Sequence, residues 1–381
     1  MKAASPTILH ITESLTRVGG MEVFVNAWLR ADAASAAATL LDSRQSLNRE
    51  GRQTGLRPNR FYSLSGIRGQ AKKLKLQCET LICHNFAGLS AVSDLIAHER
   101  LVAYLHTNSP DVWPRVLRLA PHVDAVVACG TILAKEVEQL LAESPVTVAA
   151  FESPLDDAFF RVPRISKGGP MLIGYAGRLV VEQKRVERLQ VFCEALTGRG
   201  VDYRLQITGD GPDKAMLARR LAPFPVDFLG LLKWGRVPAT FAAWDFQIIT
   251  SDYETGPLTA MEGMACGVIP IFPAIPCQAA DVLRGACDRL FYPVGNMPEA
   301  AARLQATASL APAQLELLRS DLRRLMAPRS MANHLLATRK ILGEVHAKPS
   351  LRKAIRHQSS WKDHLPLAVR CRLSGGKECL K

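Results

Sequence analysis

The sequence predicts an α/β protein made of two consecutive βα domains, each with a parallel sheet. Short apolar runs alternate with helical patterns through most of the chain, which is typical of parallel α/β units. This pattern restarts after a segment rich in Pro, Ser, Gly and charge at 152–170, and 381 residues suit two domains of ordinary size. We therefore expect an N-terminal domain at 1–160, a second domain at 171–330, and a C-terminal helix with a basic tail at 331–381.

The elements follow in order along the chain. The first strand is expected at Thr7–Ile11, followed by a loop and a helix from about Met21, and the last helical pattern covers Asn333–Val345. Further strands are expected at the apolar runs Leu81–Cys83, Leu101–Leu105, Asp124–Cys129, Val146–Phe151, Met171–Ala176, Tyr203–Thr208, Val226–Leu229, Phe246–Thr250 and Val268–Phe272.

Composition excludes several classes of protein. The chain is 48% hydrophobic, so it can bury substantial cores and is not expected to be disordered. No apolar run approaches the ~20 residues that span a bilayer, and the N-terminal apolar run is too short for a signal peptide. We therefore expect a cytoplasmic protein. Its nine cysteines are scattered without a Cys-x-x-Cys pair, which favours reduced, buried thiols.

The most informative stretch is Ser251–Gly267, where Glu254 and Glu262 stand eight positions apart. Between them a Gly-Pro turn opens a short helix, and Pro257 suits the first helical position because it has no N–H to leave unpaired. The free N–H groups of a first helical turn attract phosphate. Glu262, about a turn deeper, can accept hydrogen bonds from hydroxyls. Together these features indicate a nucleotide-sugar site.

Two cations precede this stretch in the expected second domain. Arg178 and Lys184 follow a strand and a glycine turn, six positions apart, and such a pair can reach both phosphates of one diphosphate. Alone they would be read as ordinary surface cations; the two glutamates and the Gly-Pro turn favour a diphosphate site. The turn Gly209-Asp210-Gly211-Pro212 is not a dinucleotide fingerprint, because the third glycine is missing.

This ordered set of motifs resembles the Glu-x7-Glu signature of retaining glycosyltransferases of the GT-B architecture, in family 4 (group 1 type). The resemblance runs from Thr7 to about residue 330. It implies two Rossmann-like domains facing each other across a cleft, and transfer of a hexosyl residue from a nucleoside-diphosphate sugar to a glycan or lipid-linked acceptor. Synthesis of cell-surface polysaccharide or lipopolysaccharide is the process in which we expect this transfer.

The resemblance also assigns roles to residues. It implies that Arg178 and Lys184 neutralise the leaving diphosphate, that Glu254 lies beside the donor sugar, and that Glu262 grips the ribose hydroxyls. His106, after the strand LVAYLH, matches the first-domain histidine that contacts the donor sugar; a structural histidine is the alternative there, and His84 with Asn85 is a secondary candidate on the acceptor side. Further donor contacts are implied for Gly19, Gly20, Gly209, Gly211, Thr255, Gly256, Pro257, Leu258 and Thr259; a plain flexible turn is the alternative for Gly19 and Gly20.

Neither a metal nor another cofactor is expected. The chain has no Asp-x-Asp and no Cys/His cluster with ligand spacing, and the resemblance implies that the leaving phosphate itself takes the acceptor proton. Two departures from the family pattern stand out. The chain has Glu262-Gly263-Met264 where Glu-Ala-Met is common, and Ala150-Phe151-Glu152-Ser153-Pro154 where a Pro-Asn-Gly turn often precedes the linker.

Positive charge is concentrated in two segments. Residues 42–75 and 346–381 each contain nine basic and two acidic residues, within a net charge of +13. Leu64, Ile67, Ala71 and Leu74 recur at helical spacing beside basic residues in the first segment, a pattern typical of helices on anionic membranes. An anionic inner-membrane surface is therefore a candidate partner, and a surface helix packed on the sheet is the alternative.

Three other functions remain open. A catalytically silent relative would bind nucleotide sugar without transferring it, and the altered hinge turn is compatible with that. A Rossmann-type oxidoreductase lacks support because the third glycine is missing. A nucleic-acid binder fits the pI of about 9.5 but not the 6% aromatic content or the lack of a recognisable module. The sequence does not identify the sugar, the base or the acceptor.

Overall fold

A computed structural model describes residues 7–16, 20–42, 52–58, 62–107, 112–165, 168–254, 256–284 and 287–345. The chain folds into two compact units. Among the described residues, 7–153 and 331–345 form the first unit and 154–330 form the second. The C-terminal helix α15 (Met331–Glu344) is thus part of the first unit, where it packs on α1 (Gly20–Ala31) through contacts such as Phe24 with His334.

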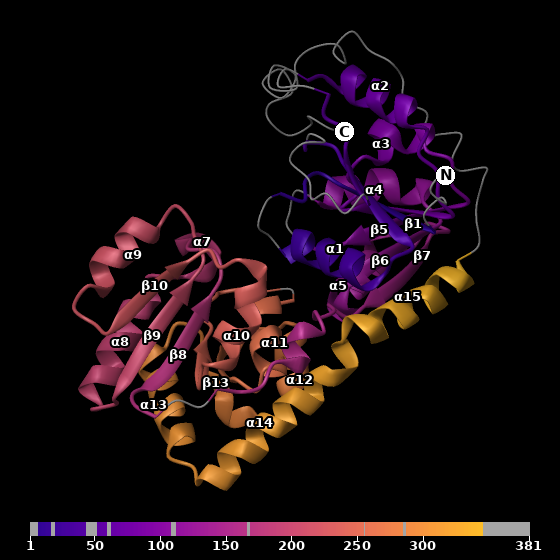
Figure 1. The fold of residues 1–381 in the computed structure, drawn as a ribbon. Coiled ribbons are helices and arrows are strands. Elements are labelled where there is room, and N and C mark those ends of the chain that lie inside the picture. Colours follow the sequence, from indigo (N-terminus) through magenta and orange to yellow (C-terminus); the bar gives the residue numbers. More distant parts are fainter. Residues whose placement is uncertain are drawn as a thin grey trace. The chain divides into compact units, whose positions relative to one another are not determined.

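The first unit contains a seven-stranded sheet with the order β3-β2-β1-β4-β5-β6-β7, in which every neighbouring pair is parallel (Figure 1). Its topological switch lies between β1 and β4, where the crevice at the carboxyl ends of the strands is the usual ligand position of such sheets. The strands are β1 (Ile8–Thr12), β2 (Ser35–Thr39), β3 (Gln53–Gly55), β4 (Thr80–His84), β5 (Arg100–Leu105), β6 (Ala125–Cys129) and β7 (Thr147–Phe151).

The second unit repeats this topology. Its six-stranded parallel sheet has the order β10-β9-β8-β11-β12-β13, with the switch between β8 and β11. Both sheets therefore follow the doubly wound Rossmann order, which confirms the predicted pair of parallel-sheet domains. The strands are β8 (Met171–Ala176), β9 (Tyr203–Thr208), β10 (Val226–Gly230), β11 (Phe246–Ile248), β12 (Ile269–Pro273) and β13 (Phe291–Tyr292).

Helices flank each sheet (Figure 1). Besides α1 and α15, the first unit contains α2 (Leu64–Leu74), α3 (Leu89–Val92), α4 (Trp113–Leu119) and α5 (Gly130–Leu140). The second unit contains α6 (Ala158–Arg161), α7 (Val181–Lys184), α8 (Arg188–Gly198), α9 (Lys214–Leu221), α10 (Val237–Ala242), α11 (Leu258–Ala265), α12 (Gln278–Leu283), α13 (Met297–Ala308) and α14 (Pro312–Met326). None of the helices in the described part of the chain has both the length and the apolar character needed to cross a bilayer.

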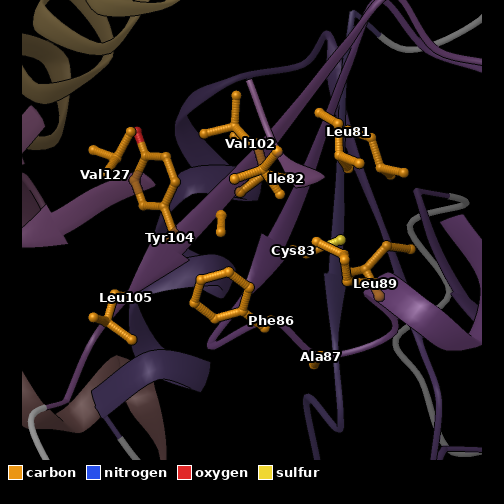
Figure 2. Packing of buried hydrophobic residues seen from close by; sticks show 14 of the residues in the cluster. Leu81, Ile82, Cys83, Phe86, Ala87, Leu89, Val102, Tyr104, Leu105 and Val127 are labelled. Carbon is orange, nitrogen blue, oxygen red and sulfur yellow. The ribbon is translucent and has the colours of Figure 1, made fainter. Parts of the chain in front are cut away.

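The core of the first unit forms around strands that are buried along their whole length. Every residue of β1, β4 and β6 is buried, as expected for parallel strands covered by helices on both faces. Figure 2 shows Ile82 of β4 close to Val102 and Tyr104 of β5 within this core. This rigid core holds the carboxyl ends of β1, β4 and β5 in fixed positions.

The apolar face of α2 does not face solvent. Leu64, Ile67 and Ala71 are fully buried in the core, and Arg68 forms a bidentate ion pair with Asp94 at 2.8 Å for each of its two hydrogen bonds. Because the same spacing of apolar residues suits a core-facing helix and a membrane-bound one, the sequence could not separate them. The expectation of an apolar membrane-binding face on this helix is wrong, and only its exposed cations remain available to a partner.

All seven cysteines in the described residues are free and buried, which agrees with the expected reduced thiols. Burial raises the pKa of the Cys277 thiol to about 11, so this thiol stays protonated and unreactive at neutral pH. Cys371 and Cys379 lie outside the described residues.

Gly174, in the middle of β8, lies against the fully buried ring of Trp244. A Cβ at this position would overlap the six-membered ring of the indole, whose Nε1 donates a 3.0 Å hydrogen bond to Gln206. We expect Gly174→Ala to destabilise the second unit by about 1–3 kcal/mol, because a packed core resists added volume. Urea unfolding measures this, with Gly235→Ala as the control, since a Cβ on Gly235 meets nothing within 4 Å. Equal stability of both variants would contradict the prediction.

Candidate active site

The candidate site of the second unit lies where β8 and β11 end. Arg178 follows β8 by two residues, Lys184 ends α7, and Glu254 lies in the loop after β11. Because parallel strands end at the same edge of their sheet, these two loops meet at the topological switch. The structure thus brings together three of the residues that the sequence predicted as catalytic.

Lys184 and Glu254 form an ion pair. The Nζ atom of Lys184 lies 2.5 Å from Oε1 of Glu254, and the two side chains are 19% and 7% exposed. The same carboxylate oxygen accepts a 2.6 Å hydrogen bond from the hydroxyl of Ser251. Glu254 therefore holds the ammonium group at a fixed point of the loop, and Lys184 needs little reorganisation to meet an anion there.

Arg178 is exposed and is connected to the same loops through Gln183. Its Nη2 donates a 3.0 Å hydrogen bond to Oε1 of Gln183, and Nε2 of Gln183 donates to the carbonyl of Tyr253 at 3.2 Å. Gln183 stands next to Lys184 but is not among the residues that the sequence predicted for the site. A single amide thus connects the guanidinium group to the loop that carries Glu254.

Asp252 holds the loop after β11 in place through contacts with two arginines. Arg185 donates a hydrogen bond to Asp252, and Nη1 of Arg188 lies 2.6 Å from its other oxygen. Burial alone would raise the pKa of Asp252, but these two guanidinium groups outweigh burial and hold the pKa below its ordinary value. The hydroxyl of Thr250 completes the connection by donating to the carbonyl of Lys184 at 2.6 Å. These contacts could not be predicted from the sequence, because the residues that form them are far apart in the chain.

The glycine turn after β9 packs on the loop that carries Arg178. A Cβ on Gly209 would overlap the carbonyl oxygen of Gly177, and a Cβ on Gly211 would overlap that of Leu179. Gly209 also has a φ of +135°, which favours glycine. Both glycines are thus needed for the packing of this turn against the Arg178 loop. The donor contact implied by the family resemblance is a separate expectation.

Helix α11 begins at Leu258, one residue later than expected. Pro257 is its N-cap residue, since the carbonyl of Pro257 accepts hydrogen bonds from the N–H groups of Ala260 and Met261. Thr259 donates from its hydroxyl to the carbonyl of Ala176 at 3.1 Å, which ties the first turn of α11 to the end of β8. Gly256 precedes the cap, and Thr255 lies outside the described residues.

Glu262 is buried on α11. Cys266, four residues on and therefore on the same face, directs its thiol toward the carbonyls of Phe159 and Pro238, so this face lies toward α6 and α10. Burial first, and the nearby carboxylate of Asp156 second, raise the pKa of Glu262 to about 8. Among the described residues, no hydrogen bond to its carboxyl group is found.

The departure from Glu-Ala-Met at Gly263 has a packing cause. A Cβ on Gly263 would overlap the side-chain oxygen of Gln247, a buried residue of β11. The amide of Gln247 is held in place by a 3.1 Å hydrogen bond from Nε2 to the carbonyl of Thr259. Only glycine at position 263 therefore leaves room for the side chain of Gln247.

In the first unit, His106 follows β5 directly and lies beside the end of β4. Its backbone N–H donates a 2.8 Å hydrogen bond to Oδ1 of Asn85, and its ring Nε2 lies 2.7 Å from Nδ1 of His84. Asn85 and Phe86 both have positive φ, 49° and 61°, which is costly for residues other than glycine and clusters at functional sites. Gly20 begins α1 and is exposed, while Gly19 lies outside the described residues.

No group of His, Cys, Asp and Glu side chains within the ranges that the structure describes could hold a metal ion. The metal-independent chemistry expected from the sequence stays a prediction.

Comparison with known proteins gives a consistent result. The family model described as "Glycosyl transferases group 1" matches residues 170–309. A GDP-mannose-dependent α-(1-6)-phosphatidylinositol dimannoside mannosyltransferase of Mycobacterium tuberculosis is 32% identical over 147 residues, 36% of this chain and 35% of that protein. An exopolysaccharide phosphotransferase of Streptomyces coelicolor is 27% identical over 268 residues, 66% of this chain and 27% of that protein.

The chain thus spans about a quarter to a third of the length of these curated relatives. Among solved structures, Anabaena HepE in complex with UDP and glucose superposes with a TM-score of 0.69 at 14% identity, over 88% of this chain and 99% of that one. At this identity the similarity concerns the fold alone, and it agrees with the two Rossmann-like units.

Proposed function

We propose that the protein is a retaining glycosyltransferase, because residues 170–309 match the family model described as "Glycosyl transferases group 1". It moves a hexosyl residue from a nucleoside-diphosphate sugar to a glycan or lipid-linked acceptor. The observation that carries the proposal is the arrangement of Arg178, Lys184 and Glu254 where β8 and β11 end. A diphosphate needs such cations, and a sugar next to it needs a carboxylate.

The proposed chemistry is the stabilisation of a leaving group. As the glycosidic bond to the donor phosphate breaks, negative charge grows on the diphosphate, and Arg178 and Lys184 stabilise it through charge-assisted hydrogen bonds. The leaving phosphate takes the proton of the acceptor hydroxyl, so no protein base and no metal are required. Glu262 accepts hydrogen bonds from the ribose hydroxyls, and His106 contacts the donor sugar.

The names of the relatives support the choice of substrates. One mycobacterial relative is named as a GDP-mannose-dependent phosphatidylinositol dimannoside mannosyltransferase, and the Streptomyces relative as an exopolysaccharide phosphotransferase. We therefore propose a role in the synthesis of a cell-surface polysaccharide or lipopolysaccharide. Both GDP- and UDP-sugars belong in the first donor test, since the solved structure with a similar fold holds UDP.

The test is release of nucleoside diphosphate from a panel of UDP-, GDP- and ADP-sugars, with and without extracts of bacterial glycolipid as acceptor. Binding to the same panel is measured in parallel, and Glu262→Ala serves as the control. Turnover of one donor, lost in the control, supports the proposal. Binding of a donor without turnover under any acceptor would favour the catalytically silent relative, and absence of both binding and turnover would overturn the proposal.

We further propose that the protein acts on the cytoplasmic side of a membrane, attracted by charge alone. The support is the exposed lysines at the C-terminal end of α2, Lys72, Lys73 and Lys75. Each lysine near an anionic leaflet contributes about 1 kcal/mol. Replacing all three with glutamine should therefore weaken binding to phosphatidylglycerol vesicles at low salt by roughly a hundredfold.

The matched control replaces two exposed lysines elsewhere in the first unit, Lys135 and Lys340. Vesicle binding that falls equally in both variants would indicate general charge attraction, and no binding by the wild-type protein would end the membrane proposal.

A further inference from the structure

Three histidines form a continuous chain across the sheet of the first unit. His10 lies in β1, His84 ends β4 and His106 follows β5, and these strands are direct neighbours. Nδ1 of His10 lies 3.0 Å from Nε2 of His84, and Nδ1 of His84 lies 2.7 Å from Nε2 of His106. His10 and His84 are fully buried, whereas His106 is partly exposed. The three rings therefore run from the core to His106, the one residue of the three that is partly exposed.

Aromatic rings enclose this chain. Trp28 packs edge-on against His10 with ring centroids 4.7 Å apart, and Phe24 packs in the same way against His106 at 5.0 Å. Burial lowers the pKa of His10 and of His106 to about 3, and lowers that of His84 well below its ordinary value. All three rings are consequently neutral at physiological pH.

A neutral imidazole carries one N–H donor and one acceptor nitrogen. Each of the two histidine–histidine hydrogen bonds needs a proton on one nitrogen and a lone pair on the other. Only two arrangements of the protons satisfy both hydrogen bonds. Either all three rings carry the proton on Nδ1, or all three carry it on Nε2. The tautomer of His106 is therefore coupled to that of His84, and through it to that of His10.

The buried end of the chain selects between the two arrangements. Nε2 of His10 is fully buried and has no hydrogen-bond partner among the described residues. Buried N–H groups without a partner are rarer in proteins than buried acceptors without one. The arrangement that leaves a lone pair at this atom places the protons on Nδ1 of all three rings.

We propose that His84 and His10 are positioning residues that fix His106 as its Nδ1–H tautomer. His106 then accepts a hydrogen bond from His84 at Nε2 and presents Nδ1–H, at the accessible end of the chain, as a donor. The ligand that matches this donor is a sugar hydroxyl oxygen. The choice of a sugar hydroxyl as the ligand rests on the proposed glycosyltransferase function, whereas the assignment of the tautomer does not.

The direct test is ¹⁵N–¹H long-range NMR correlation on protein with ¹⁵N-labelled histidine, which reports the protonated nitrogen of each ring. We expect His10, His84 and His106 to be neutral with the proton on Nδ1 from pH 6 to 8. A proton on Nε2 of His106, an even mixture of its tautomers, or a charged ring in this range would overturn the proposal. This readout needs no donor or acceptor, so it stays valid if the proposed function fails.

The variant test uses His84→Phe, which keeps an aromatic ring and removes both hydrogen bonds. His106 should then populate both tautomers, and kcat should fall about 10- to 100-fold, as for other partners that orient a functional histidine, with the donor KM changed less than about threefold. His98→Phe is the control, because His98 is a partly exposed histidine that does not belong to the row of three. If His84→Phe does not fold, His10→Phe tests the same coupling from the buried end. An unchanged His106 tautomer in either folded variant would contradict the proposal.

Discussion

Lys184→Ala should lower kcat for nucleoside-diphosphate release by about a hundred- to a thousandfold. Removing one donor that is fixed in place against the charge of a transition state costs roughly 3–4 kcal/mol. Lys184 has this property because Glu254 holds its ammonium group at 2.5 Å and the pair is largely shielded from water. Steady-state kinetics with the donor identified in the panel measures the effect.

Arg178→Ala should cause a loss on the same scale, and comparison of the two variants distinguishes a diphosphate site from general charge effects. Arg220→Ala and Lys340→Ala remove the same side chains from exposed positions on α9 and α15, and they should retain wild-type turnover. Wild-type kcat in either Arg178→Ala or Lys184→Ala would remove that residue from the proposed mechanism.

The Lys184 variant has a second effect that must be separated from catalysis. Alanine at 184 leaves the buried carboxylate of Glu254 with the Ser251 hydroxyl but without its counter-ion, and an unpaired buried charge is destabilising. The melting temperature and the affinity for the product nucleotide should therefore be measured on the same sample. A folded variant that binds nucleotide but turns over slowly would place the loss in the transition state.

Much of this fold could be predicted from the sequence, because its central strands are apolar runs. The expected strands at 171–176 and 203–208 have the observed bounds, and the others differ by one or two residues at an end. The strands that were missed, β2 (SAAAT), β3 (QTG) and β13 (FY), are short or rich in alanine. Their pairing with a neighbouring strand, rather than their own side chains, makes them strands.

The site was predictable only where its residues form a linear motif. Lys184 and Glu254 stand in such motifs, and the structure brings them together. Gln183 and Asp252 contact residues 64 to 70 positions away along the chain, and His10 contacts His84, so no local pattern could reveal them. The expectation of an apolar membrane-binding face on α2 was wrong for a different reason. The apolar periodicity was visible in the sequence, but it suits a core-facing helix and a membrane-bound helix alike.

Glu262→Gln should make the protein more stable at alkaline pH while weakening nucleotide binding. The pKa of Glu262 is raised from 4.5 to about 8 in the folded protein. The folded state thus binds more protons than the unfolded state between these values, and the free energy of unfolding falls as pH rises through that window. Glutamine cannot ionise, so the stability of the variant should exceed that of the wild type increasingly from pH 5 to pH 9, by at most about 5 kcal/mol.

Urea unfolding at pH 5, 7 and 9 measures this difference, with Glu316→Gln, at an exposed position of α14, as a matched control that should show no such trend. Equal pH profiles for wild type and Glu262→Gln would mean that the carboxyl group is not buried as the structure has it.

Nucleotide binding should reverse the protonation of Glu262. If ribose hydroxyls donate hydrogen bonds to this carboxyl group, they stabilise its charged form, and hydrogen bonds to a charged group contribute about 1.5–3 kcal/mol each. Binding near pH 7 should then release close to one proton, which calorimetric titration in two buffers of different ionisation enthalpy detects. Glu262→Gln should release none and bind roughly 10- to 100-fold more weakly. Nucleotide binding without proton release in the wild type would place the ribose elsewhere, and the buried acid would then have only a structural role in α11.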